Sequence, residues 1–485
     1  MEWAKRGDLP LCCLSLLTSS NPNSVENASR GKRDPSACLT LFNLLLRCST
    51  TANAVLEKGQ SLSLLFIPFL IFTSIFFHRL SLQPVPAKHP PVDTAFSIKP
   101  LSFLETFLPL LFLTSPPPIV ISPFTTTTTS IMVRKLQVAV SGLGRMGARH
   151  ARHFLEKTPR AELVAACDPD PQARAWATAN LAPYGTKIYE DFDEMLKHPG
   201  LEAVCVAGIT TEHAPQAIRA IEADKHVLCE KPLSVDIATC EAVVDAANKK
   251  PHLKVLCGFS RRFDASYRAA FERSDNGGIG RPTILRSQTC DKFRDDDYFV
   301  HYAAHSGGVF VDATIHDIDL ALWFFGADSI VKSVSAVGVN ARYPGLAQHA
   351  DVDNGVGVVE FWGGRVAYFY ASRMMAAGQH DVTEIIGTHG KLTVNQNAAN
   401  DLVEHHEPNG IRREIAQTYY DRFGPAFVTE SNEFTECVLD DKKLPFKLSG
   451  AVSAVKIGAA LQEALRTGVK LEFNEIGERI SKAKL

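Results

Sequence analysis

The chain has 485 residues, 45% of them hydrophobic and 21% charged, and 51 Lys and Arg against 53 Asp and Glu leave a net charge of −2. This balance argues against a disordered polyelectrolyte and against a nucleic-acid partner, so it favours small-molecule partners. The length allows about three domains, and 11 scattered cysteines without a CxxC pair indicate reduced thiols rather than disulfides or structural zinc.

Residues 1–131 differ in composition from the rest of the chain. They hold 14 of the 27 prolines, only 3 of the 31 glycines and 17 charged residues. Proline runs such as 116–118 and the threonine run 125–129 cannot continue a helix or define a core. We therefore expect a disordered or non-structural extension, with Met132 as the true start.

Two apolar stretches in this extension bear on a membrane location. The stretch 62–77 spans 16 residues and contains Pro68, and the stretch 101–113 spans 13 residues. A bilayer span needs roughly 20 apolar residues, and neither stretch follows a basic N-terminal region as a secretory signal would. We expect a cytoplasmic protein, with a membrane tether through 62–77 as the alternative.

The first regular pattern is a strand, a glycine-rich turn and a helix. Residues 136–140 predict a buried strand, the next residues spell Gly142-Leu-Gly144-Arg-Met-Gly147, and apolar residues follow at helical spacing. Gly142 permits the tight turn, Gly144 lets a pyrophosphate approach the backbone, and Gly147 lets the helix pack on its strand. This context predicts a dinucleotide site.

Asp168 supports that interpretation and selects the cofactor. It ends the predicted strand 163–167 and lies 21 residues beyond Gly147 (168 − 147), close to the roughly 20 expected for a ribose-binding acid. Its carboxylate would accept hydrogen bonds from ribose hydroxyls and repel a 2′-phosphate, which favours NAD over NADP. The alternative is a glycine-rich surface turn followed by an unrelated Asp-Pro turn.

The alternation of strands and helices continues to residue 259. We expect strands at 187–189, 203–207, 226–229 and 255–259, and helices at 192–197, 213–222 and 234–247, the last capped by Ser234. This series predicts a doubly wound α/β Rossmann domain over 132–258, with ligands beyond the carboxyl ends of its parallel strands.

The strand 226–229 ends at Glu230-Lys231-Pro232. Its position brings the Lys231 ammonium to the crevice where a nicotinamide is expected, and Pro232 restricts the backbone through a bond that can be cis. The alternative is a solvated lysine at the end of a strand.

A second set of polar residues lies on a predicted helix over 307–323, where Asp312 and His316 are one turn apart on one face. Oxidation of an alcohol needs a base for the hydroxyl proton, and imidazole titrates near working pH. Asp312 would then orient the ring of His316 or bind substrate. The alternative is an ordinary helical pair, with Asp319 bonded to a neighbouring loop.

Beyond residue 259 the pattern is that of an antiparallel sheet. We expect strands at 333–339, 354–361, 365–372, 381–386 and 390–394, and a closing helix at 451–465. These residues predict a second, α+β domain over 259–475 with a large open, mostly antiparallel sheet, followed by a tail at 476–485. A free sheet face with apolar residues would favour a protein partner.

These motifs together resemble the Gfo/Idh/MocA family of oxidoreductases over 133–475. The resemblance rests on the glycine turn, on Glu230-Lys231-Pro232, on Gly307-Gly308 followed by Asp312, His316 and Asp319, and on 384–390. Within the family the chain is most similar to inositol 2-dehydrogenases, through 258–267 and 312–319.

The resemblance implies NAD-dependent oxidation of a secondary hydroxyl of an inositol-like cyclic polyol or sugar. It implies a catalytic group of Lys231, Asp312 and His316, joined by Arg261 in substrate binding, and homo-oligomers, dimers or tetramers, formed through the sheet. The expected cofactor-binding residues are Gly142, Gly144, Arg145, Met146, Gly147, Asp168, Thr210, His213, Glu230 and Lys231.

Two stretches depart from the family. The residues before His213 do not read Thr-Pro-Asn as in many members, and 290–305 is longer than in the inositol enzymes. His301 and His305 lie four apart there, so zinc stays an alternative although no third ligand has recognisable spacing and we expect no metal. An aldose, sugar acid or diol stays open as the substrate, and a non-catalytic NAD-binding regulator stays open as the function.

Overall fold

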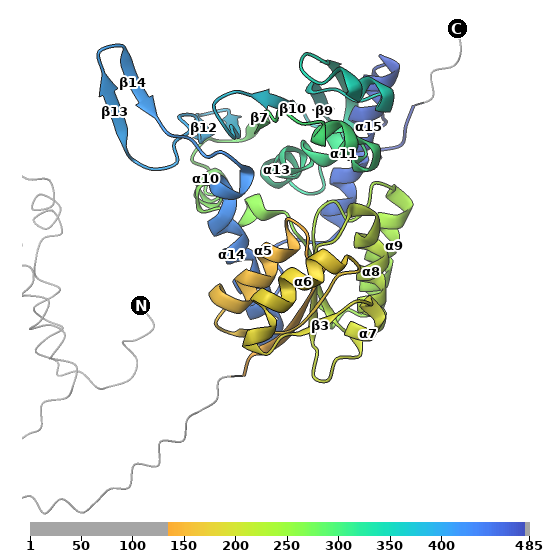
Figure 1. The fold of residues 1–485 in the computed structure, drawn as a ribbon. Coiled ribbons are helices and arrows are strands. Elements are labelled where there is room, and N and C mark those ends of the chain that lie inside the picture. Colours follow the sequence, from red (N-terminus) through yellow and green to blue (C-terminus); the bar gives the residue numbers. More distant parts are fainter. Residues whose placement is uncertain (1–133, 481–485) are drawn as a thin grey trace, which may run out of the picture. The chain divides into compact units, whose positions relative to one another are not determined.

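The computed structural model describes residues 134–480, which contain two large sheets and the helices that cover them (Figure 1). The expected extension 1–131, the start at Met132 and the apolar stretch 62–77 lie outside the described residues. In the part of the chain that is described, no helix combines the length and the apolar composition that crossing a bilayer requires.

The first sheet has the six parallel strands that the sequence predicts, and their order is β3-β2-β1-β4-β5-β6. The direction of winding reverses between β1 and β4, and a crevice at this point is the usual ligand site of such sheets. The central strands are buried along almost their whole length because helices cover both faces. The strands are β1 (Leu136–Ser141), β2 (Ala161–Cys167), β3 (Lys187–Tyr189), β4 (Ala203–Val206), β5 (His226–Cys229) and β6 (Val255–Cys257).

The helices of this domain are α5 (Gly147–Arg152), which continues as a π-helix to Lys157, α6 (Pro171–Asn180), α7 (Phe192–Leu196), α8 (Thr210–Glu222) and α9 (Ile237–Lys249). Ser234 is not the cap of α9, contrary to the prediction. The carboxylate of Asp236 accepts the N–H of Thr239 at 2.8 Å, while Ser234 Oγ accepts the N–H of Asp236 just before the helix. The helix therefore begins three residues later than the sequence predicts.

The second sheet has seven strands in the order β12-β11-β7-β10-β9-β8-β15. Its described neighbours pair antiparallel except for β7 and β10, which are parallel, so the sheet is mostly antiparallel as expected. Its strands are β7 (Pro282–Lys292), β8 (Val331–Val339), β9 (Asn354–Phe361), β10 (Arg365–Met375), β11 (Val382–Gly387), β12 (Lys391–Val394) and β15 (Leu471–Glu472).

The helices of the second domain include three that the sequence did not predict, α10, α11 and α14. The full set is α10 (Ala265–Asp275), α11 (Tyr298–Ser306), α12 (Val309–Asp312), α13 (Ile315–Phe325), α14 (Tyr419–Leu439) and α15 (Ser449–Thr467), with a separate hairpin of β13 (Glu404–Glu407) and β14 (Gly410–Arg413) (Figure 1). The closing helix expected at 451–465 is α15.

The single helix predicted over 307–323 is wrong, because the chain forms two helices with a break at Ala313 and Thr314. The carbonyl oxygen of Val309 accepts from the N–H groups of both residues, at 3.1 Å each, and from Thr314 Oγ1 at 3.3 Å. This shift in the hydrogen-bond ladder ends α12 at Asp312 and restarts the chain as α13 at Ile315. Asp312 and His316 therefore do not share one helix face.

The α14 helix joins the two domains by packing against α5 and its π-helical extension. His153 Nε2 lies 2.9 Å from the Tyr420 hydroxyl, and Arg149 donates to the Tyr419 hydroxyl at 3.1 Å. Deeper in this interface, the carboxyl of Glu430 is fully buried and neither of its oxygens has a hydrogen-bond partner. Burial raises the pKa of Glu430 to about 8.

This buried carboxyl predicts a pH dependence of stability. In the unfolded chain Glu430 ionises near its usual pKa of 4.5, whereas in the folded protein it keeps its proton to about pH 8. Its contribution to stability is therefore fully present below about pH 4.5 and is lost as the pH rises to about 8. We expect Glu430→Gln to flatten this fall in unfolding free energy, measured by urea denaturation at several pH values.

The control is Glu436→Gln on the same helix, where the side chain is 44% exposed. It should follow the wild-type profile. Parallel profiles for Glu430→Gln and wild type would show that Glu430 is not held in its neutral form.

Candidate active site

The glycine turn leaves the space that a dinucleotide needs. A Cβ on Gly142, which has φ +81°, would lie 2.2 Å from the Cα of Gly208, and a Cβ on Gly147 would lie 1.5 Å from the carbonyl oxygen of Gly142. Gly142 and Gly147 are thus required by the backbone itself. A Cβ on Gly144 would meet nothing within 4 Å, so the open space expected for a phosphate is present at this residue.

The carboxylate of Asp168 is hydrogen-bonded to the glycine turn. Its Oδ2 accepts the N–H of Leu143 at 2.5 Å, and its Oδ1 accepts the N–H of Asp170 at 2.8 Å. An ionised carboxylate offers about four lone-pair sites, so both oxygens keep acceptor capacity for ribose hydroxyls. The turn, Asp168 and the N-terminus of α5 therefore fit a bound dinucleotide.

Lys231 lies at the carboxyl end of β5, as predicted, and its bond to Pro232 is cis. Its Nζ donates to the backbone carbonyl of Asp312 at 3.1 Å and lies 3.8 Å from the Asp312 carboxylate. Glu230 faces the core, where it accepts from His150 at 2.8 Å and from the backbone N–H of Lys231 at 3.1 Å. Glu230 thus binds the backbone of Lys231 from the core side and does not line the crevice.

The carboxylate of Asp312 is held by two residues that the sequence analysis missed. The Tyr302 hydroxyl donates to Oδ1 at 3.1 Å, and Arg373 Nη2 donates to Oδ2 at 3.2 Å. Tyr302 belongs to the stretch 290–305 that departs from the family, and Arg373 lies near the end of β10. Arg373 and Asp312 are 61 residues apart in the sequence, and no local pattern indicates that they meet.

His316 is held in its neutral form, and Asp312 does not orient its ring. The His316 ring is partly exposed, its Nδ1 is buried without a hydrogen-bond partner, and the Phe259 ring packs edge-on at 6.3 Å. Burial, with the positive charges of Lys231 and Arg261, holds the pKa of His316 well below its usual value. Among residues 134–480, the expected hydrogen bond between Asp312 and this ring is not formed. The Asp312 carboxylate accepts from Tyr302 and Arg373 instead.

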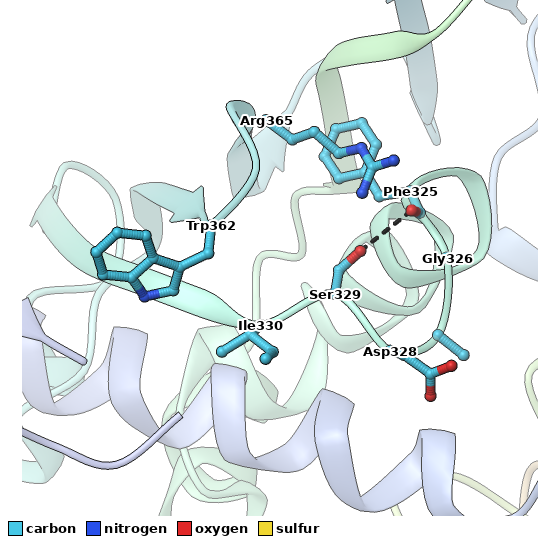
Figure 2. Close-up of a pocket in the computed structure, with 8 residues that line it drawn as sticks. Phe325, Gly326, Asp328, Ser329, Ile330, Trp362 and Arg365 are labelled. Carbon is cyan, nitrogen blue, oxygen red and sulfur yellow. Dashed lines mark hydrogen bonds between the residues drawn. The ribbon is translucent and has the colours of Figure 1, made fainter. Parts of the chain in front are cut away.

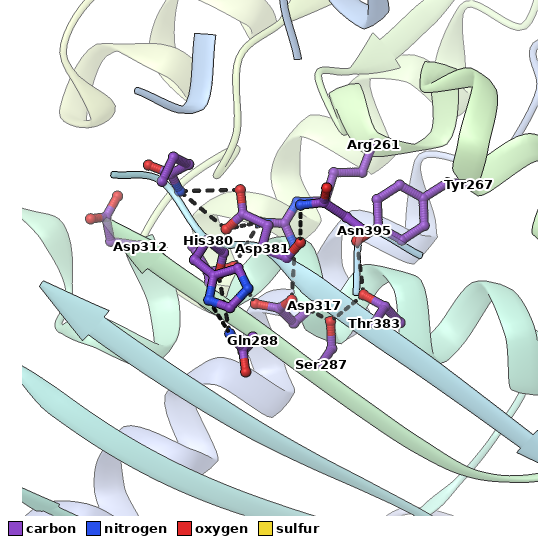
Figure 3. A network of polar contacts seen from close by, with 12 residues as sticks. Arg261, Tyr267, Ser287, Gln288, Asp312, Asp317, His380, Asp381, Thr383 and Asn395 are labelled. Carbon is purple, nitrogen blue, oxygen red and sulfur yellow. Dashed lines mark hydrogen bonds and ion pairs between the residues drawn. The ribbon is translucent and has the colours of Figure 1, made fainter. Parts of the chain in front are cut away.

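Arg261 is a core residue instead of an exposed substrate ligand. Its guanidinium is 3% exposed, donates to Asp317 at 2.7 Å and to Thr289 at 2.6 Å, and lies 3.4 Å from Asp381 (Figure 3). Burial favours loss of its proton, but the two carboxylates outweigh this and raise the pKa of Arg261. The predicted contact between Arg261 and substrate is therefore not supported, because its charge is already paired inside the protein.

The remaining predicted residues surround the crevice in different ways. His213 is buried with Nδ1 2.8 Å from the Pro232 carbonyl and Nε2 3.1 Å from the Gly208 carbonyl, so it braces the turn that carries Lys231. Thr210 begins α8 and is partly exposed. Arg145 is exposed, and its guanidinium lies over the rings of Tyr298 and Tyr419. Asp319 forms a buried two-bond pair with Arg262, which agrees with the part of the alternative interpretation that gave Asp319 a partner in a neighbouring segment.

The possible metal pair and a separate hollow lie apart from these residues. His301 and His305 are both exposed on α11, and among residues 134–480 no three His, Cys, Asp or Glu side chains gather as metal ligands.

A hollow of about 300 Å³ lies where α13 leads into β8, and Figure 2 shows its lining of Phe325, Asp328, Ser329, Trp362 and Arg365 with their neighbours. None of the predicted site residues lines it.

Comparisons with known proteins agree with this geometry. Residues 136–259 match an oxidoreductase family with an NAD-binding Rossmann fold, and residues 267–393 match the GFO/IDH/MocA C-terminal domain. The chain is 33% identical over 346 residues to a Bacillus subtilis scyllo-inositol 2-dehydrogenase (NAD(+)), covering 71% of this chain and 98% of that protein. It is 29% identical to a Thermotoga maritima myo-inositol 2-dehydrogenase, covering 70% and 99%.

Solved structures show the same likeness. A Lactobacillus casei scyllo-inositol dehydrogenase with bound NAD(H) and scyllo-inositol has a TM-score of 0.67 and 34% identity, covering 70% of this chain and 99% of that one. A Lactobacillus plantarum myo-inositol 2-dehydrogenase has a TM-score of 0.67 and 30% identity, covering 70% and 100%.

Two glycines of the motif should respond differently to alanine. Gly144→Ala adds a methyl group where the protein has open space, so we expect an almost unchanged melting temperature but weaker NADH binding. Gly147→Ala places its methyl group against the Gly142 carbonyl and should cost roughly 1–3 kcal/mol of stability. Thermal melts and NADH fluorescence titrations test both variants. Wild-type NADH affinity in Gly144→Ala would contradict the assignment of that space to the cofactor.

Proposed function

Because this chain belongs to the Gfo/Idh/MocA family of NAD-binding oxidoreductases, we propose that it oxidises a secondary hydroxyl of an inositol-like cyclic polyol to the ketone. Two relatives named as inositol dehydrogenases match it along nearly their whole length. The observation that carries the proposal is the meeting of Lys231 from the first domain with Asp312 from the second, beside the partly exposed His316.

NAD is the cofactor, and when bound it accepts a hydride from the carbinol carbon. The glycine turn and the N-terminal amides of α5 would hold its phosphates, and Asp168 would accept from its adenosine ribose. His213 and Glu230 act behind the crevice, because both are buried and both hold the turn that carries Lys231.

Lys231 and Asp312 would bind the reacting part of the polyol. The Lys231 side chain is 19% exposed, so part of the ammonium is free to donate to a hydroxyl oxygen. A fixed positive charge at this oxygen stabilises the negative charge that develops there as the proton leaves. Asp312 accepts from two side chains in the free protein and keeps lone pairs for neighbouring ring hydroxyls.

His316 would take the hydroxyl proton. A general base must be unprotonated at working pH, and the low pKa of His316, caused first by burial, satisfies this condition. Its Nδ1 is buried, so the more exposed side of the ring is the one available to substrate. With Lys231 holding the oxygen and His316 holding the proton, the step needs no metal ligand.

The outer face of the second sheet supports a further part of the proposal, a homodimer or homotetramer. Val337 and Val339 on β8 are 69% and 61% exposed, and Val356, Val358 and Tyr368 extend the apolar surface over β9 and β10. An extended apolar face of this kind usually meets a partner. Sedimentation of the purified protein should give a dimer or tetramer that Val337→Lys weakens, whereas a wild-type monomer would contradict it.

A substrate screen tests the enzymatic proposal. Purified protein with NAD should reduce the cofactor with myo- or scyllo-inositol faster than with aldoses, sugar acids or diols. Lys231→Met should lower kcat/KM at least a hundredfold, because an electrostatic donor at the reacting oxygen is worth about 10²–10³ in rate. Lys225→Met, on the same domain but away from the crevice, should retain wild-type turnover.

Each contrary result has a distinct meaning. Faster turnover of an aldose, sugar acid or diol would move the proposal to that substrate class. NADH binding without turnover of any of these compounds would favour a non-catalytic NAD-binding regulator. Full activity in Lys231→Met would remove the proposed mechanism.

A further inference from the structure

We propose that Tyr302 is a positioning residue for Asp312, and that Arg145 of the glycine turn holds the helix that carries it. This inference rests on the proposed function of Lys231 and Asp312. It adds a physical link, through helix α11, between the cofactor site and the substrate site.

Two donors face one oxygen of Asp312. The Tyr302 hydroxyl donates to Oδ1 at 3.1 Å, while Lys231 Nζ lies 3.8 Å from the same oxygen, beyond normal hydrogen-bond length. The negative charge of Asp312, together with burial, raises the pKa of Tyr302, so the hydroxyl keeps its proton and stays a donor. Without that hydroxyl, Oδ1 would be free to pair directly with Lys231 and draw the ammonium away from substrate.

The other oxygen of Asp312 is bound by Arg373, which cannot compensate for a lost Tyr302. Arg373 is 1% exposed and donates to Oδ2 at 3.2 Å, and its guanidinium carbon lies 5.0 Å from the centroid of the Phe299 ring. Arg373 thus anchors one end of the carboxylate. Tyr302 then sets how the carboxylate turns about that anchor.

Tyr302 is connected to the glycine turn through stacked side chains. Tyr298 and Tyr302 are one helical turn apart on α11, and their rings stack with an interplanar angle of 9° and centroids 5.7 Å apart. The guanidinium of Arg145 lies 5.8 Å from the centroid of Tyr298 and 5.4 Å from that of Tyr419. Arg145 follows Gly144 directly, so the residue beside the open phosphate space also touches α11 and α14.

These contacts predict the sign of the coupling between cofactor and substrate. A guanidinium can rest its flat face on an aromatic ring while its edge N–H groups donate to a phosphate. A phosphate at the turn would therefore restrain Arg145 without breaking the stack, and so restrain α11 and Tyr302. Once one ligand has ordered Arg145, α11 and Tyr302, the other ligand binds without the entropic cost of ordering them. NADH and polyol should therefore each strengthen the binding of the other.

The experiment measures binding instead of turnover. NADH and myo-inositol are both in the reduced form and do not react, so NADH fluorescence titrations with and without saturating myo-inositol report the coupling directly. In the wild type we expect myo-inositol to lower the Kd of NADH about fivefold or more. In Tyr298→Leu, which keeps the Tyr302 hydroxyl but removes the stack on Arg145, this ratio should fall to about one.

Tyr302→Phe separates the hydroxyl from the ring. It keeps the stack, so the binding of NADH alone should persist. The KM for polyol should rise roughly tenfold, because Lys231 would pair with Asp312 Oδ1 and no longer donate its charge-assisted hydrogen bond to the polyol. The control is Tyr184→Phe. The Tyr184 side chain is exposed and lies far from α11 in the sequence, so this variant should match the wild type. An unchanged KM for polyol in Tyr302→Phe would overturn the positioning role.

A substrate-free measurement keeps this inference separate from the proposed function. NADH should slow amide hydrogen exchange over residues 298–306 in the wild type and not in Tyr298→Leu. A wild type that binds NADH and protects α11 but does not bind myo-inositol would contradict the proposed substrate while supporting the link to Arg145. Equal protection of α11 in wild type and Tyr298→Leu would refute the link.

Discussion

The interaction on which the rest of the structure depends is the contact between the Lys231 ammonium and Asp312. The two residues are 81 positions apart and belong to different domains, yet Nζ reaches the Asp312 carbonyl at 3.1 Å. The first domain brings the lysine to the end of β5, beside the cofactor turn, and the second brings the aspartate to the end of α12. The proposed site for alcohol oxidation therefore exists only where the two domains are held together.

Buried charges hold them in this arrangement. His150 pairs with Glu230 beneath the lysine, and on the other side Asp317 accepts from Arg261, Ser287 and Thr289 within 2.7 Å. Because Asp317 follows His316 in α13, this pairing fixes the helix that carries His316, the proposed base. Burying such pairs costs desolvation energy and often adds little net stability. Their value here lies in the placement of Lys231 and His316.

The sequence was informative where local chemistry decides the structure. The six strands of the first sheet, the glycine turn and Asp168 follow from periodicity and from residues whose roles are set by close neighbours in the chain, whereas the approach of Lys231 to Asp312 was expected from the family resemblance. The sequence misled where long-range packing decides. The break at Thr314, the burial of Arg261 against Asp317 and the cap at Asp236 each depend on competing partners. Tyr302 and Arg373 were missed because their roles arise only when α11 and β10 reach Asp312.

A crystal structure of the protein with NADH and the preferred polyol tests the central claim most directly. We expect one hydroxyl oxygen of the polyol to lie within hydrogen-bond distance of both Lys231 Nζ and a ring nitrogen of His316, with its carbon facing the nicotinamide. A polyol bound elsewhere, or a lysine and histidine that face different oxygens, would show that Lys231 and His316 do not act together.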